Sequence, residues 1–181
     1  LPDRGLGLGA SFAGNDLNGA ITGAQTGSVN IGSVQTDGFD FNLRTNFDLG
    51  WGRLSNNFQA SYVSNYSTND GANAVGDAGY PKIRANLNNG LQVGDFSVNW
   101  NINYMDSQTY IDTSGTYHIP SWTIHNLQVN YNAPWNGTFT LGVNNLFDRD
   151  PADAHLFGTS YDYYLYNPWG RVPYFRYTQN F

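Results

Sequence analysis

The sequence predicts an all-β fold: antiparallel strands of a transmembrane β-barrel, about seven to eight in number. Three observations support this prediction: a repeated apolar–polar alternation, a polarity carried by uncharged side chains, and connections that alternate between short and long. The alternation is clearest in residues 96–104, where Phe, Val, Trp, Ile and Tyr alternate with Ser and Asn. Successive side chains on a strand point to opposite faces, so this segment has one apolar face and one polar, uncharged face. Such strands are typical of barrels with lipid outside and water inside.

The composition favours strands and limits the classes of function. Only 12% of the 181 residues are charged, glutamate is absent, and Lys82 is the only lysine. Thirteen Tyr, eleven Phe and five Trp suit strands and the aromatic belts of membrane interfaces. No apolar run reaches the roughly 20 residues of a membrane helix, so any membrane crossing must use strands. The net charge of -6 argues against nucleic acid, and the lack of cysteine excludes disulfides and thiolate metal sites.

Two segments divide the chain. Residues 1–30 are expected to form a Gly-rich loop or a weak strand, and residues 31–181 carry the alternating strands. Asp37-Gly38 has the composition of a hairpin turn, but the alternation on both sides places Gly38 inside a strand, as a bulge or a bend. The first residues lack the basic and apolar segments of a signal peptide, so we expect either that a signal was removed or that a longer chain precedes them.

The connections between the expected strands alternate in length. Short turns are expected at 50–52, 94–95 and 134–137, and long loops at about 65–80, 106–120 and 148–169. In bacterial outer-membrane barrels the short turns are periplasmic and the long loops extracellular. This asymmetry therefore predicts the same placement here.

The alternation assigns side chains to two faces. A charge facing lipid near the midplane costs about 2–4 kcal/mol, so the arginines and asparagines of the strands are expected to face the lumen. The predicted lumen-facing residues are Arg44, Arg84, Asn99, Asn101 and Arg176. The predicted lipid-facing residues are Val98, Trp100, Ile102, Leu127, Val129, Phe175 and Phe181.

No catalytic, cofactor-binding or metal-ligating residue is predicted, and the chain is not expected to be an enzyme. An acidic cluster consists of Asp148, Asp150 and Asp153 with His155. Its carboxylate oxygens are ligands that calcium accepts, but a solvated turn explains the cluster better. The histidines, at 118, 125 and 155, show no spacing typical of zinc or of acid–base pairs.

The aromatic residues before the last strand are candidates for ligand binding. Tyrosines at these positions would either anchor the barrel at the membrane interface or stack on a sugar or a siderophore catechol. Tyr161 and Tyr163, high in the last long loop, are the predicted ligand contacts.

Four segments resemble those of TonB-dependent outer-membrane receptors. Residues 141–151 (LGVNNLFDRDP) are similar to the family's penultimate-strand motif. Residues 166–171 (YNPWGR) are similar to the segment that precedes its final strand, and Phe181 is similar to its terminal aromatic residue. Further similarities lie in residues 30–40 and 120–129. Gln179 departs from the family, which usually has an aromatic or apolar residue there.

The resemblance implies the C-terminal part of a 22-stranded barrel whose lumen holds a plug domain, absent from this chain. It implies import of a scarce nutrient (siderophore, cobalamin or oligosaccharide) across the Gram-negative outer membrane, with energy from TonB acting on the plug. The implied partners are outer-membrane lipid, the plug, the TonB complex and a small-molecule or glycan substrate. No cofactor is implied.

Two alternatives remain open on the sequence. A small autonomous eight-stranded barrel, an adhesin or a pore, would need a strand from residues 1–30. A soluble, glycan-binding β-sandwich also alternates, but it should bury its apolar face against a second sheet and show more charge outside.

Overall fold

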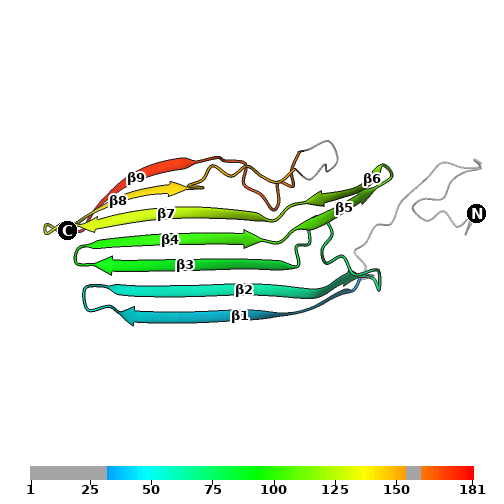
Figure 1. Cartoon of the computed structure of the whole chain (residues 1–181), viewed down its shortest axis with the longest axis horizontal. Coiled ribbons are helices and arrows are strands. Elements are labelled where there is room, and N and C mark those ends of the chain that lie inside the picture. Colours follow the sequence, from blue (N-terminus) through cyan, green and yellow to red (C-terminus); the bar gives the residue numbers. More distant parts are fainter. Residues whose placement is uncertain (1–31, 154–159) are drawn as a thin grey trace, which may run out of the picture. The chain divides into compact units, whose positions relative to one another are not determined.

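The computed structural model describes residues 32–153 and 160–181, and its described elements are strands (Figure 1). Residues 1–31 lie outside the described part, so the expected loop or weak strand at 1–30 stays a prediction. The strands are β1 (Val34–Asp48), β2 (Arg53–Thr68), β3 (Ile83–Val93), β4 (Phe96–Met105), β5 (Gln108–Asp112), β6 (Gly115–Ile119), β7 (Trp122–Asn132), β8 (Gly137–Asn144) and β9 (Val172–Gln179).

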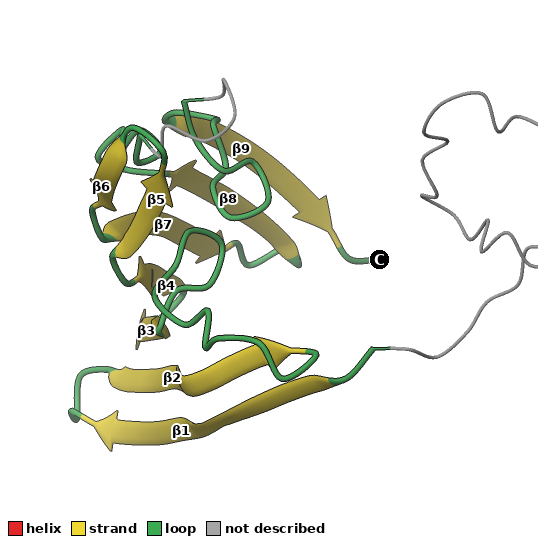
Figure 2. Ribbon diagram, turned by 90° about the vertical axis from the view of Figure 1, so that its right-hand side faces the viewer, coloured by secondary structure: helices red, strands yellow, loops and turns green. Residues whose placement is uncertain are grey.

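Seven of these strands form one antiparallel sheet in the order β1-β2-β3-β4-β7-β8-β9. The sheet follows an arc, and the connection between β2 and β3 lies on its inner side, while the β5–β6 hairpin continues beyond the ends of β4 and β7 (Figures 1 and 2). β4 pairs directly with β7 because the chain between them leaves the sheet as the β5–β6 hairpin. Strands that follow one another through tight turns pair as neighbours, which is the meander expected of barrel walls.

The short turns lie where the sequence predicts them. At the β1–β2 turn the Leu49 N–H donates to the Gly52 carbonyl (2.8 Å), and Gly50 takes a φ of 76°. Gly94, in the β3–β4 turn, has a φ of 55°. A φ in this region favours glycine, and asparagine tolerates it better than most residues. Asn136 uses that tolerance in the β7–β8 turn, with a φ of 61°.

Gly38 lies inside β1 at a register shift, as the sequence predicts. The pairing of β1 with β2 shifts between Asp37 and Gly38, which marks a bulge. A Cβ on Gly38 would lie 2.3 Å from the Tyr62 carbonyl oxygen, a distance that backbone atoms do not allow. The residue is glycine because the partner strand's backbone occupies that space.

The two faces of the sheet differ in chemistry. Cross-strand rows on one face are apolar, for example Val98 opposite Val129 and Leu141 opposite Phe175. Large side chains on this face stay exposed, because no second sheet covers it in the described part of the chain. The exposed face argues against the soluble sandwich, which needs a covering sheet.

Aromatic side chains border the apolar face near the short turns. Phe96 stacks on Tyr131 with ring centroids 4.8 Å apart, and Phe139 meets Tyr177 at 4.8 Å. Aromatic rings in such a row are typical of the girdle at a membrane interface.

A row of polar side chains interrupts the apolar face, which the alternation did not predict. Thr45, Asn56 and Asn89 lie opposite one another on β1, β2 and β3, in register with Trp100. Asn56 Nδ2 donates to Thr45 Oγ1 (3.1 Å), and Asn89 Nδ2 to the Trp100 carbonyl (3.4 Å). Their amide donors thus find partners within the sheet.

The predicted loop boundaries differ in two places. Residues 106–120, expected as a loop, include β5 and β6, and β2 continues to Thr68 within the loop expected at 65–80. Tyr110 of β5 stacks on Tyr117 of β6 (6.2 Å), so cross-strand aromatic pairing supports a hairpin that sequence alternation does not reveal. The described residues include no helix with the length and hydropathy needed to cross a membrane.

Candidate functional site

The predicted lumen-facing residues all lie on one face of the sheet. Arg44 faces Asn57, which faces Asn88 and then Asn101 across three strand pairs. The same register places the other predicted members on this face: Arg84, Asn99 and Arg176. We call it the carboxamide face, after the asparagines and glutamines that cover it.

Six of the seven predicted lipid-facing residues lie on the opposite, apolar face. Val98, Trp100 and Ile102 alternate with the asparagines of β4, and the register adds Leu127, Val129 and Phe175. Phe181 lies two residues beyond the end of β9 and is fully exposed.

A closed ring of four asparagines lies at the centre of the carboxamide face. Asn88 donates to Asn86 (2.5 Å), Asn86 to Asn103 (2.6 Å), Asn103 to Asn101 (2.5 Å) and Asn101 back to Asn88 (2.7 Å). Asn126 extends the ring by donating to Asn101 (3.1 Å). Each amide acts as donor and acceptor at once, so a polar wall is built without charge.

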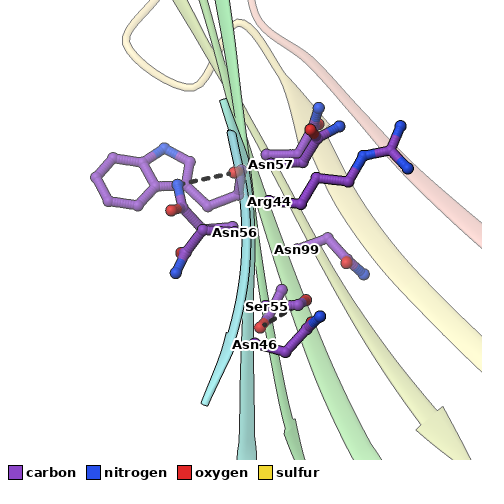
Figure 3. A pocket seen from close by; sticks show the side chains of 10 residues that line it. Arg44, Asn46, Ser55, Asn56, Asn57 and Asn99 are labelled. Carbon is purple, nitrogen blue, oxygen red and sulfur yellow. Dashed lines mark hydrogen bonds between the residues drawn. The ribbon is translucent and has the colours of Figure 1, made fainter. Parts of the chain in front are cut away.

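Beside this ring lies a hollow whose lining includes Gly90, and the Ser55 hydroxyl lies close over that glycine, 2.6 Å from where a Cβ would stand. Figure 3 shows Arg44, Asn57 and Asn99 on one side of the strands, and Asn56 on the other. The hollow has a volume of about 230 Å³, and its wall offers amides and one guanidinium to water or to another protein surface.

A small hydrophobic cluster joins the long loops on the inner side of the sheet. It consists of Met105, Ile119, Ala152 and Tyr166, all buried. Gln108, also buried, accepts from the Gly79 N–H (2.7 Å) and donates to Tyr166 Oη (3.4 Å). Because Met105 is in register with the carboxamide face, the cluster shows that this face is the inner one (Figure 2).

Tyr166 is the titratable group of this cluster. Burial raises the pKa of Tyr166, and the nearby Asp162 carboxylate raises it further. The Gln108 hydrogen bond and the Arg84 charge act in the opposite direction and lower it. The fold therefore favours the neutral hydroxyl.

The structure separates the two predicted ligand tyrosines. Tyr161 is half-buried against the loop cluster. Tyr163 is 62% exposed, with its ring 4.2 Å from that of Tyr164. Their role in binding remains a prediction.

The acidic segment holds a turn together. The Asp148 carboxylate accepts from the Arg171 N–H (2.6 Å), and Asp148 itself has a φ of 56°. Within the described residues no group of His, Asp or Glu could hold a metal ion, and His155 lies outside them.

The two described histidines lie apart. His118 is exposed on β6. His125 lies on β7 beside Trp100 (ring centroids 5.7 Å) and Phe147 (4.9 Å), with its Nδ1 buried and unpartnered.

Sequence reasoning missed a second hollow, bordered by Trp122 and Trp169. Trp122 is in register with Met105, on the carboxamide face. The sequence signal that could have indicated this hollow is Trp122 itself, an aromatic residue in the polar register of its strand. Trp169 comes from the segment before β9, and only the fold brings the two indoles to one hollow.

The exposed apolar face and the carboxamide face define a class: the wall of a membrane-spanning β-barrel. The chain matches the family model described as TonB dependent receptor-like, beta-barrel, over residues 2–146. That match spans most of the chain, so the chain belongs to this family, whose members are transporters of the Gram-negative outer membrane. No match was found among curated proteins or among solved structures.

Proposed function

We propose that this chain is the C-terminal part of a 22-stranded outer-membrane barrel that imports a scarce nutrient with energy from TonB. The observation that carries the proposal is one sheet with two faces, an exposed apolar one and a carboxamide one. Lipid would cover the apolar face, including Val98, Trp100 and Ile102. Water and the plug would contact the carboxamide face.

The edges of the sheet support a larger barrel. β1 and β9 are its two end strands, and each pairs on one side only within the described residues. Unpaired N–H and C=O groups in hydrocarbon cost several kcal/mol each, so a sheet in a membrane must close. Further strands of the same receptor would complete it.

The arginines of the carboxamide face suit contact with a plug. Arg44, Arg84 and Arg176 are exposed on the inner face, away from the apolar side chains. Their guanidinium groups would pair with carboxylates or backbone carbonyls of the plug. The plug would in turn carry the segment that engages TonB.

The test is uptake by Gram-negative cells that produce the intact receptor. Labelled ferric siderophore, cobalamin and oligosaccharide would be offered to cells with and without TonB. We expect one class to accumulate, and its uptake to fall to background without TonB. Uptake that persists without TonB, or a protein absent from the outer-membrane fraction, would contradict the proposal.

A further inference from the structure

The hollow between Trp122 and Trp169 lies on the carboxamide face, beside the long loops. It has a volume of about 410 Å³, within the size range of small-molecule sites, and no charged side chain lines it. Four asparagines complete the polar part of its lining: Asn126, Asn144, Asn145 and Asn167.

The two indoles differ in how they are held. The Trp122 Nε1–H donates to the Asp150 carbonyl (2.9 Å), and its ring meets the Tyr166 ring edge-on at 5.2 Å. Trp169 is 72% exposed and stacks on no described ring. Trp122 is thus a fixed wall, whereas Trp169 offers a free aromatic face.

The asparagines divide into used and available amides. Asn126 accepts from the Asn145 N–H (2.9 Å), and Asn145 bonds the backbone of Arg149. Asn167 accepts from the Trp169 N–H (3.0 Å) through Oδ1, which leaves its Nδ2 donors without a described partner. The Asn144 side chain has no hydrogen bond to any described residue.

Electrostatics at the hollow disfavour an anionic ligand. No lysine or arginine side chain lines it, and the Asp148 carboxylate lies directly behind Gly170, 2.7 Å from where a Cβ would stand. An anion entering here would lose hydration and meet negative charge. A neutral ligand would lose less hydration free energy and would not be repelled by that charge.

We propose that this hollow binds a neutral saccharide. The C–H groups of a sugar ring carry slight positive charge and suit the negative face of the Trp169 indole. Hydroxyl groups both donate and accept, so they can pair with the amide of Asn144 and with the Nδ2 donors of Asn167. This proposal rests on the proposed function, because the saccharide would be the imported nutrient, held where the carboxamide face meets the long loops.

The experiment measures binding to the purified intact receptor in detergent micelles by titration calorimetry. The probes are maltotriose, cellotriose and xylotriose, with ferric citrate as the anionic comparison. We expect at least one saccharide to bind and ferric citrate not to bind. Trp169→Ala should weaken saccharide binding by about tenfold or more, because the stacking surface is lost.

Two further variants separate binding from folding. Asn144→Ala removes an amide that bonds no described residue, so it should weaken binding while the protein stays folded. Trp135→Ala is the matched control, since Trp135 is also exposed but lies in the β7–β8 turn at the other end of the sheet. It should leave saccharide affinity unchanged.

Three results would overturn the saccharide site: none of the three sugars binds, binding is unaffected by both Trp169→Ala and Asn144→Ala, or ferric citrate binds in a manner that Trp169→Ala abolishes. TonB-dependent uptake of an iron chelate together with any of these would leave the proposed function standing. Saccharide binding without TonB-dependent uptake would support the saccharide site and contradict the proposed function.

Discussion

Asn145 and Arg149 are joined by two hydrogen bonds that close the turn after β8. Asn145 Nδ2 donates to the Arg149 carbonyl (2.9 Å), and the Arg149 N–H donates to Asn145 Oδ1 (2.8 Å). Asn145 takes a φ of 51° and is 5% exposed. One side chain thus replaces the missing backbone partners of a tight, buried turn.

Replacing Asn145 should destabilise the protein, and two variants separate the causes. Asn145→Gly keeps the positive φ but loses both side-chain bonds, and leaving such groups unpaired costs about 1–3 kcal/mol. Asn145→Ala loses the same bonds and adds about 1–2 kcal/mol for the left-handed backbone. Urea unfolding of the detergent-folded protein should therefore rank the alanine variant below the glycine variant.

The neighbouring Asn144 supplies the control for this comparison. It is exposed and its side chain bonds no described residue, so Asn144→Ala should change stability by less than about 0.5 kcal/mol. Equal stability of the protein and its Asn145→Ala variant would show that the turn does not depend on this side chain.

Gly142 and Tyr174 form a second close contact, across β8 and β9. The Tyr174 ring lies over Gly142, so a Cβ there would be 2.3 Å from Tyr174 Cζ, and Tyr174 Oη donates to Gln128 Oε1 (2.9 Å). Gly142→Ala should push the ring away, break that bond and cost about 1–3 kcal/mol in the free energy of unfolding.

A double variant tests whether the Tyr174 ring is the cause. With Tyr174→Ala already present, Gly142→Ala should cost much less, because the clash has gone and the two effects are not additive. Gly32→Ala, where the nearest atom would be 3.4 Å away, is the control and should be nearly neutral. Additive costs would mean that Gly142 is needed for another reason.

The raised pKa of Tyr166 predicts how the stability of the loop cluster changes at alkaline pH. Its pKa is raised by burial, so its contribution to stability is complete below the ordinary value of 10.0 and is lost as pH rises through the raised pKa. Tyrosinate absorbance, compared between the protein and Tyr166→Phe, should show this hydroxyl ionising above the ordinary range. Fluorescence of Trp122, whose ring contacts Tyr166, should change over the same interval. Ionisation at or below the ordinary value would contradict the packing of the cluster.

The faces of the sheet could be predicted because they depend on a local rule. Alternation along β4 separates Asn99 and Asn101 from Val98 and Trp100 whatever the partner strand is. The short turns followed from glycine, asparagine and their spacing, and the bulge at Gly38 from the alternation on either side. In each case the signal lies within a few residues.

The loop cluster and the tryptophan hollow could not be predicted in this way. Gln108 contacts Tyr166, which lies 58 positions later in the sequence. Trp122 of β7 lines the same hollow as Trp169, which lies in the connection between β8 and β9. No period or motif links such positions, because only the register of the whole sheet and the packing of three loops bring them together. The polar row through Asn56 and Asn89 was missed for a related reason, since its hydrogen bonds cross between strands.

The assignment of the two faces to lipid and lumen leads to a direct chemical prediction. The chain contains no cysteine, so single cysteines can be introduced and labelled one at a time. Asn99→Cys and Val98→Cys occupy neighbouring positions on opposite faces of β4 and form a matched pair.

In receptor folded into lipid vesicles, a charged maleimide should label Asn99→Cys faster than Val98→Cys by at least about tenfold. The reason is that bringing a charge to the lipid face costs about 2–4 kcal/mol. Detergent-unfolded samples should remove the difference, which controls for intrinsic reactivity. Equal labelling in vesicles, or faster labelling of Val98→Cys, would show that hydrocarbon does not cover the apolar face and would contradict the barrel-wall interpretation.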